Sequence, residues 1–294
     1  MHKNMTLINN WAAPYGAYDC IFNAAVFWLE LYELKTNPLY QYNWGFFYDP
    51  ETDIFGPNVP KQSLLSFLRE IYGSDLKEIM FEIPKNEWLM IALNTYELSY
   101  IKDLYQRVEQ NHYVLAFWDG NNVTICDPFY KYFETISLSR FYKLWSRFMV
   151  PIIVLSEPNT SQIININYIT PYILQTDYRK QYHKTTAQIV AQLCKLESGI
   201  QNKELDETLK RYFGCFRSFI LNRYKHFQDD LKNPYKLKIV GGWSAILKTL
   251  FLILSGKHMD VQKIIQMLLN IVELELEYLE TLSGKDTCSC IGVN

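Results

Sequence analysis

The stretch HYVLAFWDGNNVTICDP (residues 112–128) decides the fold of the N-terminal half of the chain. Two runs of strand-forming residues flank the turn residues DGNN, which is a strong signal for an antiparallel β-hairpin. A loop of two or four residues places Trp118 opposite Val123, and His112 and Asp127 then project from the same face as diagonal neighbours. A three-residue loop would turn Asp127 to the opposite face. The hairpin therefore predicts a carboxylate–imidazole pair if its loop has two or four residues.

Composition limits the classes of protein to which the chain can belong. Its 294 residues are 49% apolar and 16% aromatic, and 29 Lys and Arg face 31 Asp and Glu. No basic stripe or tail is present, so a nucleic-acid partner is not expected. The N-terminus lacks the apolar run of a signal peptide, and the most apolar stretch (245–254) is shorter than the roughly 20 residues that cross a bilayer. We expect a cytoplasmic protein without a membrane partner.

The order of predicted elements indicates an α+β unit followed by an all-helical unit, at about 1–157 and 163–294. The polar, proline-containing segment SEPNTSQ (156–162) marks the boundary. Helical periodicity predicts helices over 19–35, 63–73 and 137–148 in the first unit. Strands are predicted over 79–83, 88–94, 112–118, 122–127 and 150–156, and further helices over 178–198, 204–230, 242–255 and 260–283.

The first predicted helix carries a cysteine at its start. In GAYDCIFNAAVFWLELYELK (16–35), Asp19 is a suitable N-cap and Cys20 follows it directly. The helix is apolar on nearly every side, which is typical of a helix buried within a domain. A thiol at a helix N-terminus ionises more readily, and a nearby protonated histidine adds to this effect. Cys20 is thus either a small core residue or a nucleophile.

Cys20, His112 and Asp127 together have the residue types of a nucleophile, a base and a group that orients the base. The other cysteines that lie in predicted elements are expected to pack in the core: Cys126, Cys194 and Cys215. The histidines of the helical unit show no metal-ligand spacing, and no metal or organic cofactor is expected.

The order of these three residues resembles the papain-like fold in its bacterial form, as in the leader-peptidase domains of bacteriocin exporters. The chain is most similar to the butirosin-biosynthesis protein H family, which joins a papain-like unit to a helical unit. The resemblance rests on four pieces besides Cys20 and its flanks: NWGFFYDP (43–50), WLMIALNTYELSY (88–100), the His112–Asp127 hairpin and ETISLSRFYKLW (134–145).

The resemblance implies a cysteine acyltransferase of specialised-metabolite biosynthesis, such as antibiotic assembly. An acyl or aminoacyl group would pass from the phosphopantetheine thioester of a carrier protein, through Cys20, to an amine-bearing small acceptor. Exporter peptidases carry a Gln about six residues before the Cys, where this chain has Pro14. The Cys20 backbone N–H and the Asn23 side chain are the candidates to replace that oxyanion donor.

Other side chains are candidates to surround the reaction. Tyr96 and Tyr100 follow a predicted strand and either line an acceptor cleft or pack in the core. The aromatic segment 40–48 is a candidate to keep water from an acyl-enzyme. The stripe of apolar residues over 260–283 suits a homodimer as well as a helical bundle.

Two alternatives to an acyltransferase remain open at this stage. The first is a non-catalytic binding or scaffold protein on an inherited papain-like fold, for which the missing Gln is an argument. The second is a cysteine peptidase or amidase, which would hydrolyse its substrate without an amine acceptor.

Overall fold

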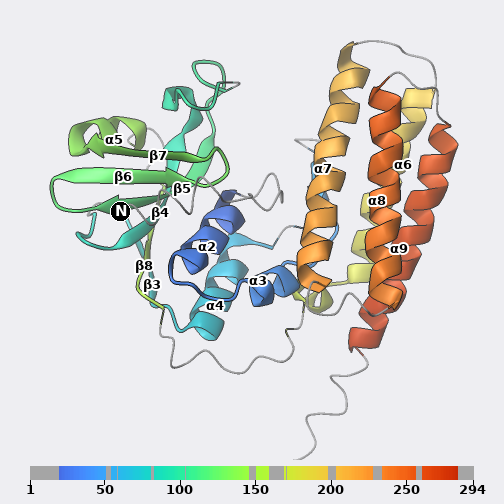
Figure 1. The fold of residues 1–294 in the computed structure, drawn as a ribbon, viewed down its shortest axis with the longest axis horizontal. Helices are drawn as coiled ribbons and strands as arrows, with labels where there is room; N and C mark the ends of the chain where they lie inside the picture. The colour runs from blue at the N-terminus through green and yellow to red at the C-terminus, as the bar shows by residue number, and fades with distance from the viewer. Residues whose placement is uncertain are drawn as a thin grey trace, which may run out of the picture. The chain divides into compact units, whose positions relative to one another are not determined.

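A computed structural model of the full chain describes most of its residues. The described ranges are 20–50, 54–57, 59–80, 83–102, 104–145, 150–158, 169, 171–197, 203–227, 234–255 and 260–283. The predicted N-cap Asp19 and residue Pro14 lie outside them. The protein is an α+β protein with antiparallel sheets and a helical C-terminal region (Figure 1).

The chain divides into two compact units that are not contiguous in sequence. The first unit includes 18–36 and 60–167, and the second includes 37–59 together with 168–294. From sequence, the boundary is predicted in the segment 156–162, with residues 37–59 in the first unit. Residues 37–59 instead join the helical unit, for reasons of packing that are given below.

The first unit is built on a six-stranded antiparallel sheet with the strand order β3-β8-β4-β5-β6-β7. Four of its strands overlap the predicted ones closely, whereas β3 lies earlier than the predicted 79–83 and β7 was not predicted. The bounds of the strands are β3 Leu76–Ile79, β4 Trp88–Asn94, β5 Asn111–Trp118, β6 Asn122–Asp127, β7 Tyr132–Ser137 and β8 Ile152–Leu155.

The β5–β6 hairpin has the register predicted for a loop of two or four residues. Trp118 pairs with Val123 and Leu115 with Cys126. The Asp119 carboxylate closes the loop by accepting from the backbone N–H groups of Asn121 and Asn122, both at 2.8 Å. This register fixes which strand residues share a face, and it places His112 and Asp127 on the same one.

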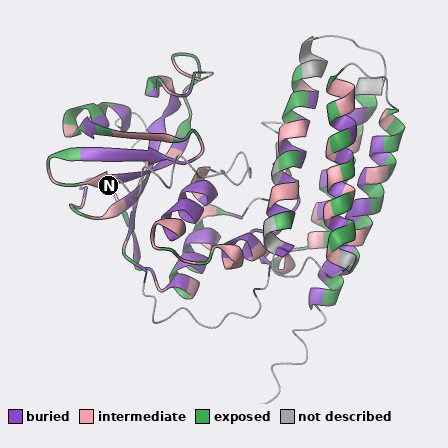
Figure 2. Ribbon diagram, in the orientation of Figure 1, coloured by how far each residue is buried: buried purple, intermediate pink, exposed green. Residues whose placement is uncertain are grey.

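Helices cover both faces of this sheet, as the burial of successive residues in β4 and β6 requires (Figure 2). One face packs against α5 (Leu138–Trp145) through a cluster that includes Ile91, Val114 and Ile125. On the opposite side, α2 (Cys20–Leu31) packs against β5, and every residue of α2 from Phe22 to Leu29 is buried. A further helix of the unit is α4 (Lys61–Tyr72), which ends at Gly73 with the left-handed conformation expected of a C-cap.

The second unit contains four long helices, which agree with the predicted helical segments to within a few residues except at the start of α8. They are α6 Tyr178–Glu197, α7 Lys203–Phe227, α8 Pro234–Leu254 and α9 Val261–Ser283. α7 packs on α8, α8 on α9, and α6 on α9. The short elements among the described residues of this unit are α3 Asn37–Tyr42, β1 Phe47–Asp49, β2 Ile54–Gly56 and the 3-10 turn Tyr172–Gln175.

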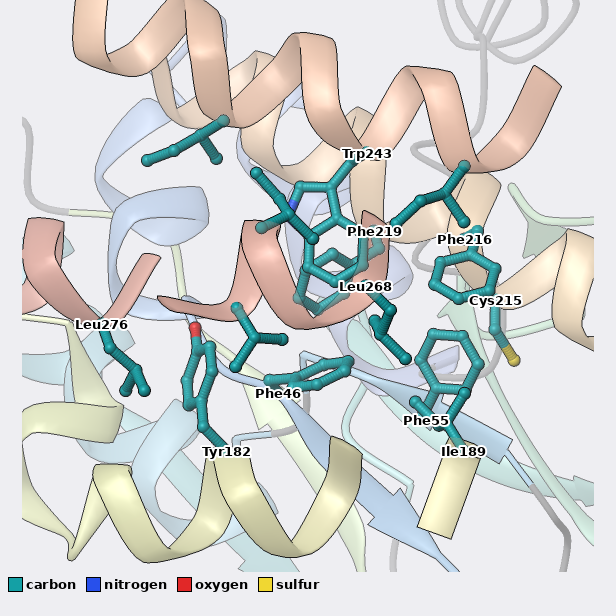
Figure 3. Packing of buried hydrophobic residues seen from close by; sticks show 14 of the residues in the cluster. Phe46, Phe55, Tyr182, Ile189, Cys215, Phe216, Phe219, Trp243, Leu268 and Leu276 are labelled. Carbon is teal, nitrogen blue, oxygen red and sulfur yellow. The ribbon is translucent and has the colours of Figure 1, made fainter. Parts of the chain in front are cut away.

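The segment 37–59 belongs to the helical unit because its aromatic side chains complete that unit's core. Trp44, Phe46 and Phe55 are at most 1% exposed, and Figure 3 shows Phe46 and Phe55 among residues of α6, α7, α8 and α9. The expectation that residues 40–48 shield an acyl-enzyme therefore needs correction, since Trp44 and Phe46 are used in this core.

A fully buried ion pair lies in the same core. Glu275 and Arg223 are each 0% exposed, and the Glu275 carboxylate accepts from Arg223 Nε at 2.6 Å and from a terminal guanidinium nitrogen at 2.7 Å. Trp243 and Tyr182 donate to the same carboxylate, each at 2.6 Å. Arg223 also donates to the carbonyl of Gly45 at 3.0 Å, which ties the 37–59 segment to α7.

α8 starts earlier than the predicted helix 242–255, since it begins at Pro234. Proline suits the first position of a helix. The stretch Lys236–Leu254 of α8 has the length and apolar composition of a membrane span, the single such case in the described part of the chain. A core helix of a soluble bundle meets the same criteria. Four of its residues belong to the buried core of the unit: Ile239, Trp243, Ile246 and Leu250.

Candidate active site

Cys20 lies at the first residue of α2, where the orphan N–H groups of a helix favour a negative charge. Its side chain is only partly buried. The backbone N–H of Tyr113, on β5, donates to Cys20 Sγ at 3.3 Å. This contact holds the sulfur against the end of β5, beside the strand residue that follows His112.

His112 and Asp127 form the pair that the hairpin register predicts. His112 Nε2 lies 2.7 Å from Asp127 Oδ2, and Asp127 is 1% exposed. Because Nε2 is engaged by the carboxylate, Nδ1 is the ring nitrogen left to exchange a proton with a reacting group. Cys20 lies close enough to His112 to help raise the pKa of that imidazole. The three residues predicted from sequence therefore meet in one place.

The pKa of His112 reflects this environment. Burial acts to lower it, but the Asp127 charge and hydrogen bond, together with the interactions with Cys20, raise it to about 10. His112 is therefore an imidazolium at neutral pH, and its Nε2–H donates to Asp127. A cation beside Cys20 favours the thiolate, which is the nucleophilic form of cysteine.

Asp127 is held by four donors, which fix the orientation of its carboxylate. Oδ1 accepts from the backbone N–H groups of Phe129 and Tyr130 at 3.1 and 3.3 Å, as in an Asx turn. Oδ2 accepts from His112 and from the Tyr100 hydroxyl, the latter at 3.0 Å. The turn-forming and the base-orienting functions of Asp127, which are alternatives in sequence, are both present in the structure.

The three residues expected to bind substrate have different surroundings. Asn23 lies one helical turn after Cys20, is 1% exposed, and neither of its amide atoms has a hydrogen-bond partner among the residues described. Tyr100 donates to Asp127 rather than standing free to line a cleft. Tyr96 donates its backbone N–H to the Asn94 side chain at 3.0 Å, in the turn that follows β4.

Two aromatic residues at the site were not found by sequence reasoning. The Tyr130 ring packs edge-on against His112 with centroids 5.5 Å apart, and the Tyr132 ring stacks on Tyr100 at 3.8 Å. Both follow Asp127 in the run DPFYKY (127–132), and that proximity in sequence is the signal that could have identified them.

Of the three other cysteines that the structure describes, two have the expected burial. Cys126 and Cys215 are buried, and burial raises the pKa of the Cys126 thiol. Cys194 is exposed on α6, so the prediction that it packs in the core is wrong. The apolar neighbours of Cys194 in sequence lie on a different side of the helix, since successive residues are about 100° apart.

Comparison with known proteins identifies no relative from which a function could be inferred. No protein-family model and no curated protein matches this chain. Within the described residues, no group of three His, Cys, Asp or Glu side chains is placed to hold a metal ion. The chemistry of the site is therefore argued from Cys20, His112 and Asp127.

Proposed function

We propose that the first unit is a papain-like catalytic domain and that the protein is a cysteine-dependent acyltransferase. The observation that carries this proposal is the junction of Cys20, His112 and Asp127, with the 2.7 Å bond between His112 and Asp127. A buried helix that begins at the cysteine and an antiparallel sheet that carries the other two residues support the papain-like assignment. The resemblance to the butirosin-biosynthesis protein H family supports acyl transfer.

In the first half-reaction, the Cys20 thiolate attacks the carbonyl carbon of a carrier-protein thioester. A carbon–sulfur bond forms to Cys20, and the bond to the pantetheine sulfur then breaks. The departing thiolate takes the proton of the His112 imidazolium and leaves as a thiol. The products are an acyl-enzyme on Cys20 and a neutral His112, whose ring Asp127 holds in place.

In the second half-reaction, an amine of the acceptor attacks the acyl-enzyme. His112 takes the proton of the attacking nitrogen, the bond to Cys20 Sγ breaks, and the amide product leaves. Cys20 is again a thiolate and His112 an imidazolium, so protons and charges balance over the cycle. The Cys20 backbone N–H and the Asn23 amide are the proposed donors to the oxyanion in both halves, and an unpartnered buried amide such as Asn23 fits that role.

The proposed partners follow from this chemistry. The donor is an acyl or aminoacyl group on the phosphopantetheine arm of a carrier protein, and the acceptor is a small amine in specialised-metabolite assembly. We assign the reaction to the cytoplasm, where carrier-protein pathways operate and thiols stay reduced. The pantetheine belongs to the donor, so the proposed mechanism requires no cofactor of the enzyme's own.

Intact-mass spectrometry of the full chain, incubated with acyl-pantetheine thioesters, tests the proposal. We expect a mass gain equal to the acyl group, mapped to Cys20 by peptide analysis and lost in Cys20→Ala. Cys194→Ala is the matched control, because it removes an exposed thiol elsewhere and should leave the mass gain intact. Addition of a primary amine should then release the acyl group as an amide.

Two results would contradict the acyltransferase. Absence of acylation at Cys20 with every thioester tried would favour a non-catalytic protein on this fold. Acylation that is discharged by water as fast as by amines would indicate a hydrolase.

A further inference from the structure

The Tyr100 hydroxyl shares one oxygen of Asp127 with the base of the candidate site. It donates to Asp127 Oδ2 at 3.0 Å, and His112 Nε2 lies 2.7 Å from the same atom. The other oxygen, Oδ1, is held by two backbone N–H groups of the following turn. The carboxylate is therefore fixed without Tyr100, and the hydroxyl adds something other than orientation.

The state of the Tyr100 hydroxyl allows only one direction for this bond. Burial, and after it the Asp127 charge, raises the pKa of Tyr100 above its ordinary value of 10.0. The phenol therefore stays protonated and donates, while the carboxylate accepts. Stacking on Tyr132, with ring planes 13° apart, holds the Tyr100 ring in the position that this bond requires.

We propose that Tyr100 is a positioning residue, which draws charge from Asp127 Oδ2 and so limits how firmly His112 holds its proton. This inference rests on the proposed function, in which His112 must give up a proton and recover it in every cycle. When His112 is neutral, Asp127 has lost its cationic partner, and the Tyr100 hydrogen bond is then strongest. Tyr100 thus favours the neutral imidazole, which is the form needed to accept the proton of the acceptor amine.

The groups around the two residues define the control. His112 is faced by Asp127 at the end of β6, by Cys20 on α2 and by Tyr130 in the turn. Tyr100 is faced by Asp127, Tyr130, Tyr132 and Cys126. Tyr132 is the matched control, because its hydroxyl donates to Glu134 instead of Asp127, and Glu134 in turn pairs with Arg140.

The experiment is an NMR titration of the His112 ring in the full chain. A Cys20→Ala background removes the coupled titration of the sulfur, and His112→Gln identifies the resonance among the five histidines. Tyr100→Phe keeps the stacked ring and removes only the hydroxyl, so circular dichroism should show a folded variant. We expect Tyr100→Phe to raise the midpoint of the His112 titration by about one pH unit, and Tyr132→Phe to leave it unchanged.

A second measurement keeps the inference open to refutation if Tyr100→Phe does not fold. Growth with 3-fluorotyrosine makes the Tyr100 hydroxyl a stronger hydrogen-bond donor. The midpoint of the His112 titration should then fall, and it should fall equally in the Tyr132→Phe variant. In an Asp127→Asn background, neither change at Tyr100 should move the midpoint.

An unchanged or lower midpoint in Tyr100→Phe would overturn the inference, as would an equal rise in Tyr132→Phe. The titration needs no substrate, so it separates this inference from the proposed function. A protein that fails to acylate Cys20 can still show the Tyr100 effect, and an active acyltransferase can lack it.

Discussion

At the scale of single residues, His112 holds its proton between the buried Asp127 carboxylate and the Cys20 sulfur. Its folded pKa of about 10 lies above the ordinary value of 6.5, so the folded protein binds more protons than the unfolded chain between those values. The resulting stabilisation is complete below pH 6.5 and is lost as the pH rises through about 10. The acid–base chemistry of the site therefore also appears in the stability of the fold.

We predict that the free energy of unfolding falls between pH 7 and pH 10 in the native sequence and falls less steeply in His112→Gln. Urea unfolding at several pH values measures both slopes. His183→Gln, a substitution at an exposed position of α6, should keep the native slope. Parallel slopes for the native protein and His112→Gln would contradict the assignment of this proton to His112.

The sequence contains enough to predict that Asp127 and His112 are diagonal neighbours on one face, because hairpin pairing depends only on residue parity and loop length. The hydrogen bond from Tyr100 to Asp127 could not be predicted from the sequence in this way. Tyr100 lies in the connection between β4 and β5, whose path depends on tertiary packing rather than on a local period. Its hydroxyl could be placed on Asp127 only once that path was known.

At the scale of elements, the β5–β6 loop sets the relation between His112 and Asp127. We predict that deletion of Asn121 shortens the loop to three residues and turns Asp127 to the opposite face. The His112 midpoint should then fall from about 10 toward its ordinary value, since the Asp127 charge no longer faces it. NMR titration of the His112 ring measures the change.

Asn121→Ala is the matched control for the deletion. It keeps the loop length and the backbone N–H that Asp119 accepts, so the His112 midpoint should not move. A deletion variant that is folded and keeps the native midpoint would refute the proposed dependence on register.

The elements that sequence reasoning missed are those with weak periodic signals. β7 is largely exposed or half-buried, with Ile136 as its buried residue, so it lacks a clear alternation. β1 and β2 have three residues each, which is too short for a period to be recognised. The long helices α6, α7 and α9 were found because their apolar stripes extend over many turns.

At the scale of the whole molecule, the chain leaves the first unit after α2, completes the core of the second unit with residues 37–59, and returns. Composition could not predict this path of the chain, because aromatic residues such as Trp44 and Phe46 can pack in the core of either unit. Long-range contacts decide the matter, and Arg223 with the Gly45 carbonyl is one of them.

We predict that Glu275→Gln lowers the stability of the helical unit by about 3–5 kcal/mol, because it leaves the Arg223 guanidinium buried without a counter-charge. Thermal unfolding followed by tryptophan fluorescence measures the loss, since Trp44 and Trp243 lie beside the ion pair. Glu273→Gln, at an exposed position of the same helix, should change stability by less than about 0.5 kcal/mol. Equal effects of the two substitutions would contradict the buried ion pair.

The most direct test of the central claim is the rate at which iodoacetamide alkylates Cys20 as a function of pH, resolved from the other cysteines by peptide mapping. We expect Cys20 to react at pH 6 at least about tenfold faster than the exposed Cys194, because the positively charged His112 lies beside its sulfur, and we expect His112→Ala to remove this advantage. A Cys20 that reacts no faster than Cys194 at pH 6, with or without His112, would contradict the claim.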